Sequence, residues 1–340
     1  MQENRVLVYG AYGHTGKFVV AELCRQGFAP ILSGRDSEKL SILGQQYPGL
    51  ITVVADTKQP SSLDAAFMQA DMVINCAGPY LDTAEPIIQS VLRFGKHYID
   101  LSAEQKSVLD VYEKFLTPAR QAGIIIIPAG AFYGGLGDLL SSALNKNLEI
   151  MEDIKIYVGL DSWVPTKGTR QTGKRNHYTR FELANRALRP IEQGNSFYWT
   201  FPKPIETREM IAVPLTEIVT ISKHLPVNNI KSFISKNAIE DIRREDTPEP
   251  KPIDRKHRSS QHFCMQVVAK GGNYCKSIMA QGKDIYAVSA PLVVEATKRI
   301  LSGKFKMNGV TTLGETFDAS AFLESLSDDD LTVSQIVDFV

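Results

Sequence analysis

Three glycines spaced by threes follow a short apolar stretch near the start of the chain, where Val6-Leu7-Val8-Tyr9 leads into Gly10-x-x-Gly13-x-x-Gly16. Gly10 permits a tight turn, Gly13 lets the backbone approach a phosphate, and Gly16 lets a helix pack on the preceding strand. The free N–H groups and the dipole at the start of that helix attract anions. The pattern predicts a dinucleotide pyrophosphate site, although a purely structural turn could select the same glycines. The residues expected to contact the cofactor here are Gly10, Tyr12, Gly13, His14, Thr15 and Gly16.

The end of the second predicted strand, residues 30–33, indicates which cofactor is bound. It is followed by Gly34-Arg35-Asp36. An acidic residue at this position binds the adenosine ribose of NAD, whereas an arginine with a small hydroxyl residue suits the 2′-phosphate of NADP. Ser33 and Arg35 therefore favour NADP, with Asp36 as the cap of the next helix. The alternative is NAD, with Asp36 on the ribose and Arg35 as a solvated surface charge.

Apolar strands continue to alternate with helices as far as residue 127. Strands are expected at 51–56, 72–76, 97–101 and 124–127. Continuous apolar strands joined by helices are typical of a parallel sheet buried on both faces, which binds ligands at the carboxyl ends of its strands. The sequence thus predicts an α/β fold with a Rossmann doubly wound parallel sheet. Further cofactor contacts are expected from Asp56 on the adenosine side and from Asn75, Ala77, Gly78 and Pro79 nearer the nicotinamide.

Four of these segments, in this order, resemble one known family. They are the glycine triplet, Ser33-Gly34-Arg35, the run from Asn75 to Tyr80, and His97-Tyr98-Ile99-Asp100-Leu101-Ser102-x-Glu104. Together they look like the saccharopine dehydrogenase-like NADP-binding family, which includes saccharopine reductases and trans-acting enoyl reductases. The resemblance covers about the first 135 residues. It implies NADP(H) and hydride chemistry, and it leaves the substrate open.

Beyond residue 137 the pattern changes. Apolar residues alternate from Ile154 to Leu160, which is typical of a strand with one buried face. Further strands are expected at 215–221, 230–234, 262–270 and 274–281, and helices at about 287–301 and 312–326. We therefore expect a second α+β domain on a mostly antiparallel sheet, which could also form a homodimer contact. The expected divisions are 1–137 for the NADP-binding domain, 138–310 for the substrate and dimerisation domain, and 311–340 for a C-terminal helix returning to the first domain.

A basic segment lies in this second half. Residues 167–189 contain seven lysines and arginines against one acid. Arg170 and Lys174 are therefore candidates for binding an anionic substrate group. The alternative is a solvated, mobile loop. Residues 243–252, rich in charge and proline, are expected to form an exposed loop.

Reduction of a carbonyl, imine or enoyl group needs a hydride donor and a proton donor. The candidate proton donors are Tyr80, Asp138, His177 and Tyr178, each of which also has an ordinary structural explanation. Two other dehydrogenase classes lose support. A short-chain dehydrogenase carries a lysine four residues after a tyrosine, and no tyrosine here has one. A sugar dehydrogenase of the glucose-fructose oxidoreductase type has Glu-Lys-Pro where this chain has Asp100-Leu101-Ser102.

Composition narrows the possible partners. The net charge is zero, which provides no general attraction to nucleic acid or to an anionic membrane. No apolar run is long enough to span a membrane, and residues 1–5 leave no room for a signal peptide before the first strand, so we expect a cytoplasmic protein. The four cysteines lack metal-ligand spacing, so no metal is expected and the thiols are expected to stay reduced.

The sequence therefore predicts an NADP(H)-dependent oxidoreductase. It would transfer hydride to or from a C=N, C=C or C=O group of a small, anionic metabolite. The alternative is a non-catalytic NADP-binding redox sensor, favoured by the lack of an identifiable proton donor.

Overall fold

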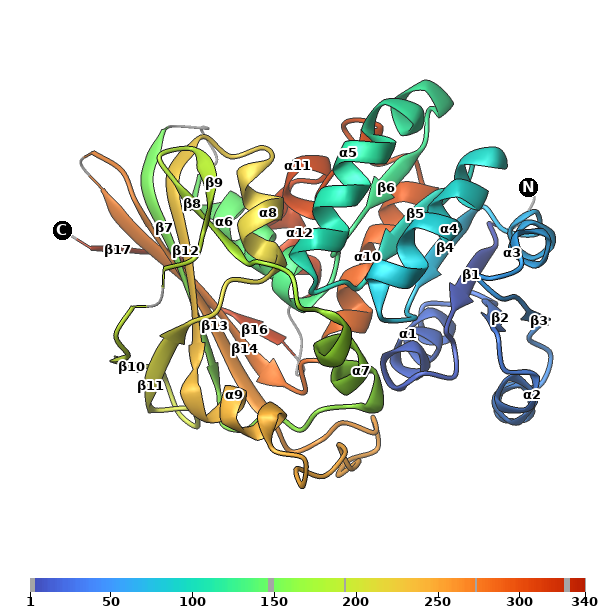
Figure 1. Ribbon diagram of the computed structural model, residues 1–340, viewed down its shortest axis with the longest axis horizontal. Coiled ribbons are helices and arrows are strands. Elements are labelled where there is room, and N and C mark those ends of the chain that lie inside the picture. Colours follow the sequence, from blue (N-terminus) through green and yellow to red (C-terminus); the bar gives the residue numbers. More distant parts are fainter. Residues whose placement is uncertain (1–3, 146–149, 193, 273, 327–330, 340) are drawn as a thin grey trace.

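The protein is built on two β-sheets that lie side by side, with helices packed around and between them (Figure 1). The structure is a computed structural model, and it describes residues 4–145, 150–192, 194–272, 274–326 and 331–339. The expected fold class, a doubly wound sheet with a second α+β domain, is confirmed.

The first sheet is entirely parallel, with the order β15-β6-β5-β4-β1-β2-β3. Its central strands carry apolar residues on both faces because helices cover both faces. The strands are β1 (Val6–Tyr9), β2 (Ile31–Gly34), β3 (Thr52–Val54), β4 (Met72–Asn75), β5 (His97–Asp100), β6 (Ile125–Ile127) and β15 (Gly309–Val310). The helices between the first six strands are α1 (His14–Arg25), α2 (Ser37–Gln46), α3 (Pro60–Phe67), α4 (Tyr80–Arg93) and α5 (Gln105–Ala122).

The second sheet is mostly antiparallel, as expected, and its path is β10-β11-β12-β7-β13-β14-β16. Its one parallel pair along this path is β12 with β7. The strands are β7 (Met151–Leu160), β8 (Phe181–Ala184), β9 (Ala187–Pro190), β10 (Phe197–Thr200), β11 (Thr207–Ala212), β12 (Val227–Ser235), β13 (His262–Lys270), β14 (Cys275–Lys283), β16 (Leu331–Val333) and β17 (Val337–Phe339). Sequence reasoning did not predict β8 to β11, β16 or β17. In the β13–β14 hairpin, Cys264 faces Gln281 and Cys275 faces Lys270, so the two thiols are out of register and both remain free, as expected.

Two predicted elements differ in the structure. Residues 215–221 were expected to form a strand, but α8 (Thr216–Ser222) is a helix. Nearly all of its side chains are buried, so the sequence shows neither the apolar spacing of an amphipathic helix nor the alternation of a half-buried strand. The basic segment was weighed as a mobile loop, but its first part forms α7 (Lys167–Arg175), with Thr166 as N-cap accepting from the amide of Thr169. Helix α9 (Lys236–Arg243) precedes the expected loop at 243–252, which contains no helix or strand after Arg243.

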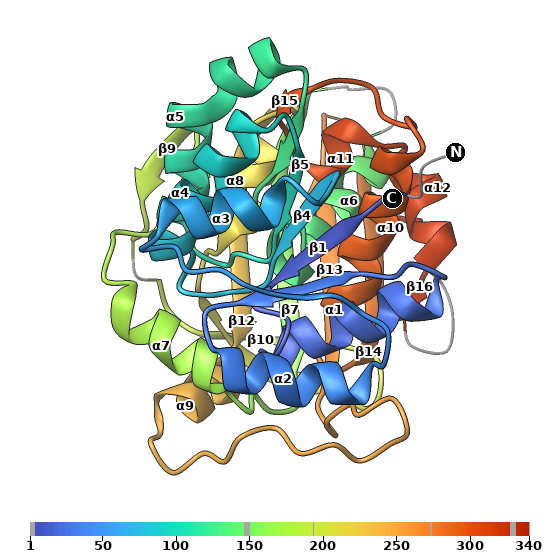
Figure 2. The ribbon, with the colours of Figure 1, turned by 90° about the vertical axis from the view of Figure 1, so that its right-hand side faces the viewer.

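The chain returns to the first sheet earlier than the expected boundary at 311. The crossing is a π-helix, η1 (Phe132–Leu136), followed by α6 (Gly137–Leu144). Later, α10 (Ser289–Leu301) packs on α1, and β15 pairs with β6 (Figures 1 and 2). By contrast, α11 (Leu313–Thr316) and α12 (Ala319–Leu326) pack on α6, and β16 and β17 extend the second sheet. The acidic stretch noted at 327–330 lies outside the described residues.

In the described part of the chain no helix combines the length and apolarity that crossing a membrane would require.

Gly16→Ala is expected to destabilise the first domain. A Cβ at Gly16 would lie 2.2 Å from the carbonyl oxygen of Gly10, so the helix would have to move off the loop. Overpacking of this kind costs about 1–3 kcal/mol. Urea unfolding monitored by circular dichroism measures the change. Gly173→Ala is the matched control because a Cβ there meets nothing within 4 Å, and it should be neutral or slightly stabilising. Equal stability of the two variants would contradict the close helix–loop contact.

Candidate active site

The glycine loop is held tightly between β1, β2 and β4. The amides of Gly10 and Ala11 both donate to the carbonyl oxygen of Ser33, at 2.8 and 3.1 Å. Gly10 has a φ of +78°, and a Cβ there would lie 3.0 Å from Ala77. The turn therefore needs glycine for its backbone conformation as well as for space.

The first turn of α1 presents free amides to the outside of this loop. Gly13 is the N-cap, and no acidic side chain lies in the first turn. Among the described residues no acceptor pairs with the amides of His14, Thr15 or Gly16. His14 is largely enclosed, its ring lies 5.3 Å from those of Phe18 and Tyr286, and burial lowers its pKa, so it adds no charge. An anion at this helix end would meet unpaired donors and the positive end of the dipole.

Tyr12 and Asp36 shape the adenosine end of the site. A Cβ on Gly34 would lie 2.6 Å from the Tyr12 ring, so the ring packs directly on this glycine. The Tyr12 hydroxyl accepts from the amide of Asp36 at 3.2 Å. Asp36 itself caps α2 by accepting from the amide of Lys39, and its carboxylate pairs with the Lys39 ammonium at 2.7 Å. The expectation that Asp36 is an N-cap is confirmed, and Lys39 lowers the pKa of its carboxyl.

Arg35, by contrast, is exposed and makes no ion pair with any residue the structure describes. Its neighbour Ser33 is fully buried, with a hydroxyl that has no partner in the described structure. Asp56 lies just beyond β3, and its carboxylate accepts from the amide of Lys58 at 2.9 Å. A free guanidinium beside an acid already paired with lysine is the arrangement expected for reading a 2′-phosphate.

Asn75 organises the loop after β4 from within the protein. It is completely buried, its amide group donates to the hydroxyl of Tyr98 at 3.1 Å, and its carbonyl oxygen accepts from the amide of Ala77 at 3.0 Å. The side chain therefore fixes the course of the segment from Ala77 to Pro79, where the Gly78–Pro79 peptide is cis.

A cavity of about 170 Å³ opens between this loop, the start of α1 and the second domain. Thr15 and Gly78 border it from the predicted cofactor loops, and Tyr80 borders it from the first turn of α4. Gly168, Thr169 and Thr172 of α7 cover it. The other lining residues are Cys76, Leu101, Ser102, Ala103, Glu104, Ala131, Phe132, Tyr133, Trp163, Thr166, Ile285, Tyr286 and Ser289.

Glu104 is the one carboxyl group among the described residues of this lining. Its two oxygens accept from the amides of Tyr80 at 2.8 Å and Leu81 at 3.2 Å, at the start of α4. Burial raises the pKa of Glu104 to about 7, against the lowering effect of these amides. Burial also raises the pKa of Tyr80 well above its usual value and that of Cys76 as well, so both stay protonated. Glu104 is therefore the lining group able to change protonation near neutral pH.

The remaining predicted proton donors do not line this cavity. Asp138 is fully buried at the start of α6, where its oxygens bind the ring of His224 at 2.5 Å and the amide of Gly314 at 2.6 Å. His177 and Tyr178 are exposed just beyond α7, and the Lys106 ammonium lies over the Tyr178 ring.

The basic residues of α7 also lie outside the cavity. Arg170 donates to the carbonyl oxygens of Arg244 and Thr247, at 3.1 and 2.7 Å, and so ties α7 to the loop after α9. Arg175 pairs with Asp82 of α4 at 2.9 Å. Lys174 is exposed. The hydroxyl and glycine residues of α7, rather than its cations, line the cavity.

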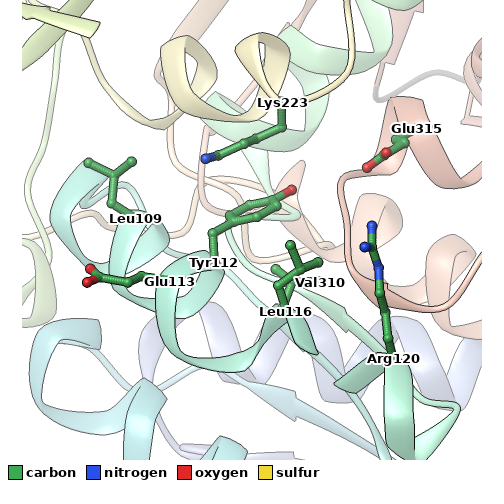
Figure 3. A pocket seen from close by; sticks show the side chains of 8 residues that line it. All are labelled: Leu109, Tyr112, Glu113, Leu116, Arg120, Lys223, Val310 and Glu315. Carbon is green, nitrogen blue, oxygen red and sulfur yellow. The ribbon is translucent and has the colours of Figure 1, made fainter. Parts of the chain in front are cut away.

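A larger cavity of about 510 Å³ lies elsewhere, beside α5 and β15 (Figure 3). The Lys223 ammonium sits 4.6 Å from the centre of the Tyr112 ring, and Figure 3 shows Arg120 and Glu315 to the right of that ring, with their charged ends directed toward the space between them. None of its lining residues comes from the glycine loop or the loop after β4. Its position is therefore unsuited to a nicotinamide.

Residues 6–127 match the family model described as the saccharopine dehydrogenase NADP binding domain. The match covers just over a third of the chain. The resemblance seen in the sequence is confirmed, and with it NADP(H) as the cofactor of the first domain.

Full-length relatives are matched only in part. A saccharopine dehydrogenase-like oxidoreductase of Bos taurus is 32% identical over 37% of this chain and 34% of its own length. A trans-acting enoyl reductase of Mycobacterium bovis is 31% identical over 42% of this chain and 35% of its own, and a lipid droplet localized protein of Caenorhabditis elegans is 26% identical over 51% and 44%. The chain therefore spans less than half the length of these curated relatives. The crystal structure of saccharopine dehydrogenase (L-Glu forming) from Saccharomyces cerevisiae covers 98% of this chain and 100% of its own, with a TM-score of 0.69 and 11% identity, which shows a shared fold.

Arg35→Ala is expected to weaken NADPH binding roughly 10- to 100-fold, because hydrogen bonds to charged groups contribute about 1.5–3 kcal/mol. NADH binding should change by less than threefold. Fluorescence titration of both cofactors measures the two dissociation constants. Arg25→Ala, in the last turn of α1, is the control and should leave both unchanged. An equal loss for the two cofactors would mean that Arg35 does not read the 2′-phosphate.

Proposed function

We propose that the protein is an NADPH-dependent reductase that transfers hydride to a C=C, C=O or C=N group. The observation that carries the proposal is the cavity in which Thr15 and Gly78 of the cofactor loops meet Glu104, whose pKa lies near 7. When bound, NADPH supplies the hydride. The chain must then position the acceptor, exclude water and deliver one proton.

Glu104 is the proposed proton donor. In its protonated form it can transfer a proton to the substrate atom next to the carbon that receives hydride, leaving a carboxylate. The amides of Tyr80 and Leu81, at 2.8 and 3.2 Å, are already in place to stabilise that negative charge. The proton is regained from solvent after the product leaves. One hydride and one proton are thus added across the double bond in each turnover.

The cavity also indicates the character of the reacting group. Among the residues that the structure describes, no lysine or arginine lines it, and Leu101, Ala131 and Phe132 make much of it apolar. An unpaired anion would be costly there, so we propose that the reacting end of the substrate is uncharged. Any anionic part of the substrate would lie outside, near the exposed cations of α7 such as Lys174. The volume of about 170 Å³ is smaller than that of ordinary ligand pockets, which fits a small reacting group better than a whole metabolite.

The homodimer through the second sheet and the cytoplasmic location remain predictions from the sequence. Sedimentation velocity tests the first, and fractionation of cells expressing the full-length protein tests the second.

Glu104→Gln is expected to lower kcat by roughly 10²- to 10⁴-fold, the usual contribution of a general acid. In the wild type the protonated fraction of Glu104 falls as the pH rises through about 7, so kcat should fall with it, and the variant should lose this dependence. NADPH oxidation is followed by absorbance with a panel of enoyl thioesters, semialdehydes and imines. Glu113→Gln, on the exposed side of α5, is the control.

Two results would oppose the proposal. An unchanged kcat in Glu104→Gln would remove Glu104 from the reaction. Tight NADPH binding without turnover on any member of the panel would instead support the non-catalytic sensor.

A further inference from the structure

The cavity beside α5 and β15 has no part in the reaction proposed above. Its volume of about 510 Å³ lies in the usual range for ligand pockets. Helix α5 supplies most of its lining, and single residues come from β15, from α11 and from the position directly after α8. Among the described residues, none of those that line it borders the cavity that contains Glu104. The protein therefore has a second, separate place for a small molecule.

Two opposite charges face each other across this second cavity without meeting. Figure 3 shows the guanidinium of Arg120 and the carboxylate of Glu315 directed toward the space between them. No ion pair or hydrogen bond joins the two, and neither has another charged partner within the part of the chain that the structure describes. An arginine and a carboxylate bind each other strongly when they touch. Because these two stand apart, both are available to a ligand that carries charges of both signs.

The fold holds both side chains in place. A Cβ at Gly309 would lie 2.7 Å from the Cγ atom of Arg120, so the stem of the arginine packs directly on the backbone of β15. The Oε2 atom of Glu315 accepts from the hydroxyl of Thr311 at 2.8 Å, while Oε1 has no partner among the described residues. The amide of Glu315 donates to the hydroxyl oxygen of Thr312 at 3.2 Å. Both charges are thus positioned before a ligand arrives, which lowers the cost of binding it.

The rest of the lining indicates what the ligand carries beside its charged end. Apolar walls come from Leu109, Tyr112, Leu116 and Val310. The Lys223 ammonium lies over the Tyr112 ring and has no acidic partner in the described structure, and burial lowers its pKa. A second cation beside it would be repelled. Glu113 also borders the cavity, but Figure 3 shows its carboxylate directed away from Tyr112. We therefore expect the remainder of the ligand to be apolar and uncharged.

We propose that this second cavity binds a zwitterionic α-amino acid with an apolar side chain. The carboxylate of the ligand accepts from Arg120, and its ammonium donates to Glu315. Each charge of the ligand then meets one of opposite sign, whereas a simple carboxylate would leave Glu315 unpaired beside a like charge and a simple amine would do the same to Arg120. The site lies apart from the reductase cavity, so the proposal holds whether or not the protein reduces a substrate.

The test measures binding of L-norvaline to the NADP⁺-saturated protein by ligand-observed NMR. Pentanoate, which lacks the ammonium, and butylamine, which lacks the carboxylate, are the matched ligands. Arg120→Met keeps an unbranched side chain over Gly309, and Glu315→Gln keeps an acceptor for the neighbouring hydroxyl. Arg189→Met and Glu324→Gln are the controls, because both residues are exposed and lie outside the cavity, on β9 and α12. Thermal melting confirms that each variant is folded.

L-Norvaline is expected to bind more tightly than either matched ligand. Each cavity variant should weaken its binding roughly 10- to 100-fold, as expected for the loss of a hydrogen bond to a charged group, and the two controls should not. The proposal is overturned if L-norvaline does not bind, or if it binds the folded cavity variants as tightly as the wild type. It is also overturned if pentanoate binds as tightly as L-norvaline and is unaffected by Glu315→Gln, because the cavity would then be a simple anion site.

Discussion

Two buried carboxylates hold together the loops at the carboxyl ends of β4, β5 and β6. Asp100 accepts from the amides of Ser102 at 2.9 Å and Ala129 at 2.7 Å, and Glu104 accepts from the first amides of α4. Burial raises the pKa of Asp100 to about 6. These bonds set the positions of the cavity walls before any ligand arrives. Surface loops are usually the most variable parts of a fold, so the geometry of this site depends on these hydrogen bonds.

Local signals were sufficient for the first domain. The glycine triplet, the apolar strands and Asp36 as a cap each act over a few residues, so the sequence alone could predict them. The separate roles of Asn75 and Glu104 could not be predicted in this way. Asn75 is held inside the protein by a hydrogen bond to Tyr98 of the neighbouring strand, and Glu104 has a raised pKa because the fold buries it. Both features depend on which strands and helices become neighbours in the fold, and the linear sequence does not show this.

The second domain was less predictable for a related reason. Residues 216–221 are buried almost completely, so the alternation that separates helix from strand is absent. The basic composition of α7 suggested an anion site, whereas Arg170 and Arg175 are occupied by contacts with the chain itself. The composition shows how many charges a segment carries, but only the tertiary structure shows which of them are already bound by other groups of the chain.

The C-terminal part of the chain completes the first sheet, and this affects folding during synthesis. The edge of the first sheet is completed by β15, whose residues follow β6 by about 180 positions, and α1 is covered by α10. During synthesis the N-terminal half emerges with the edge of β6 unpaired and one side of α1 uncovered. Contacts this distant along the chain slow folding, and an exposed strand edge is open to pairing with other chains. The first sheet and the packing of α1 are therefore completed only after the C-terminal quarter has been synthesised, and until then their uncovered surfaces are open to aggregation.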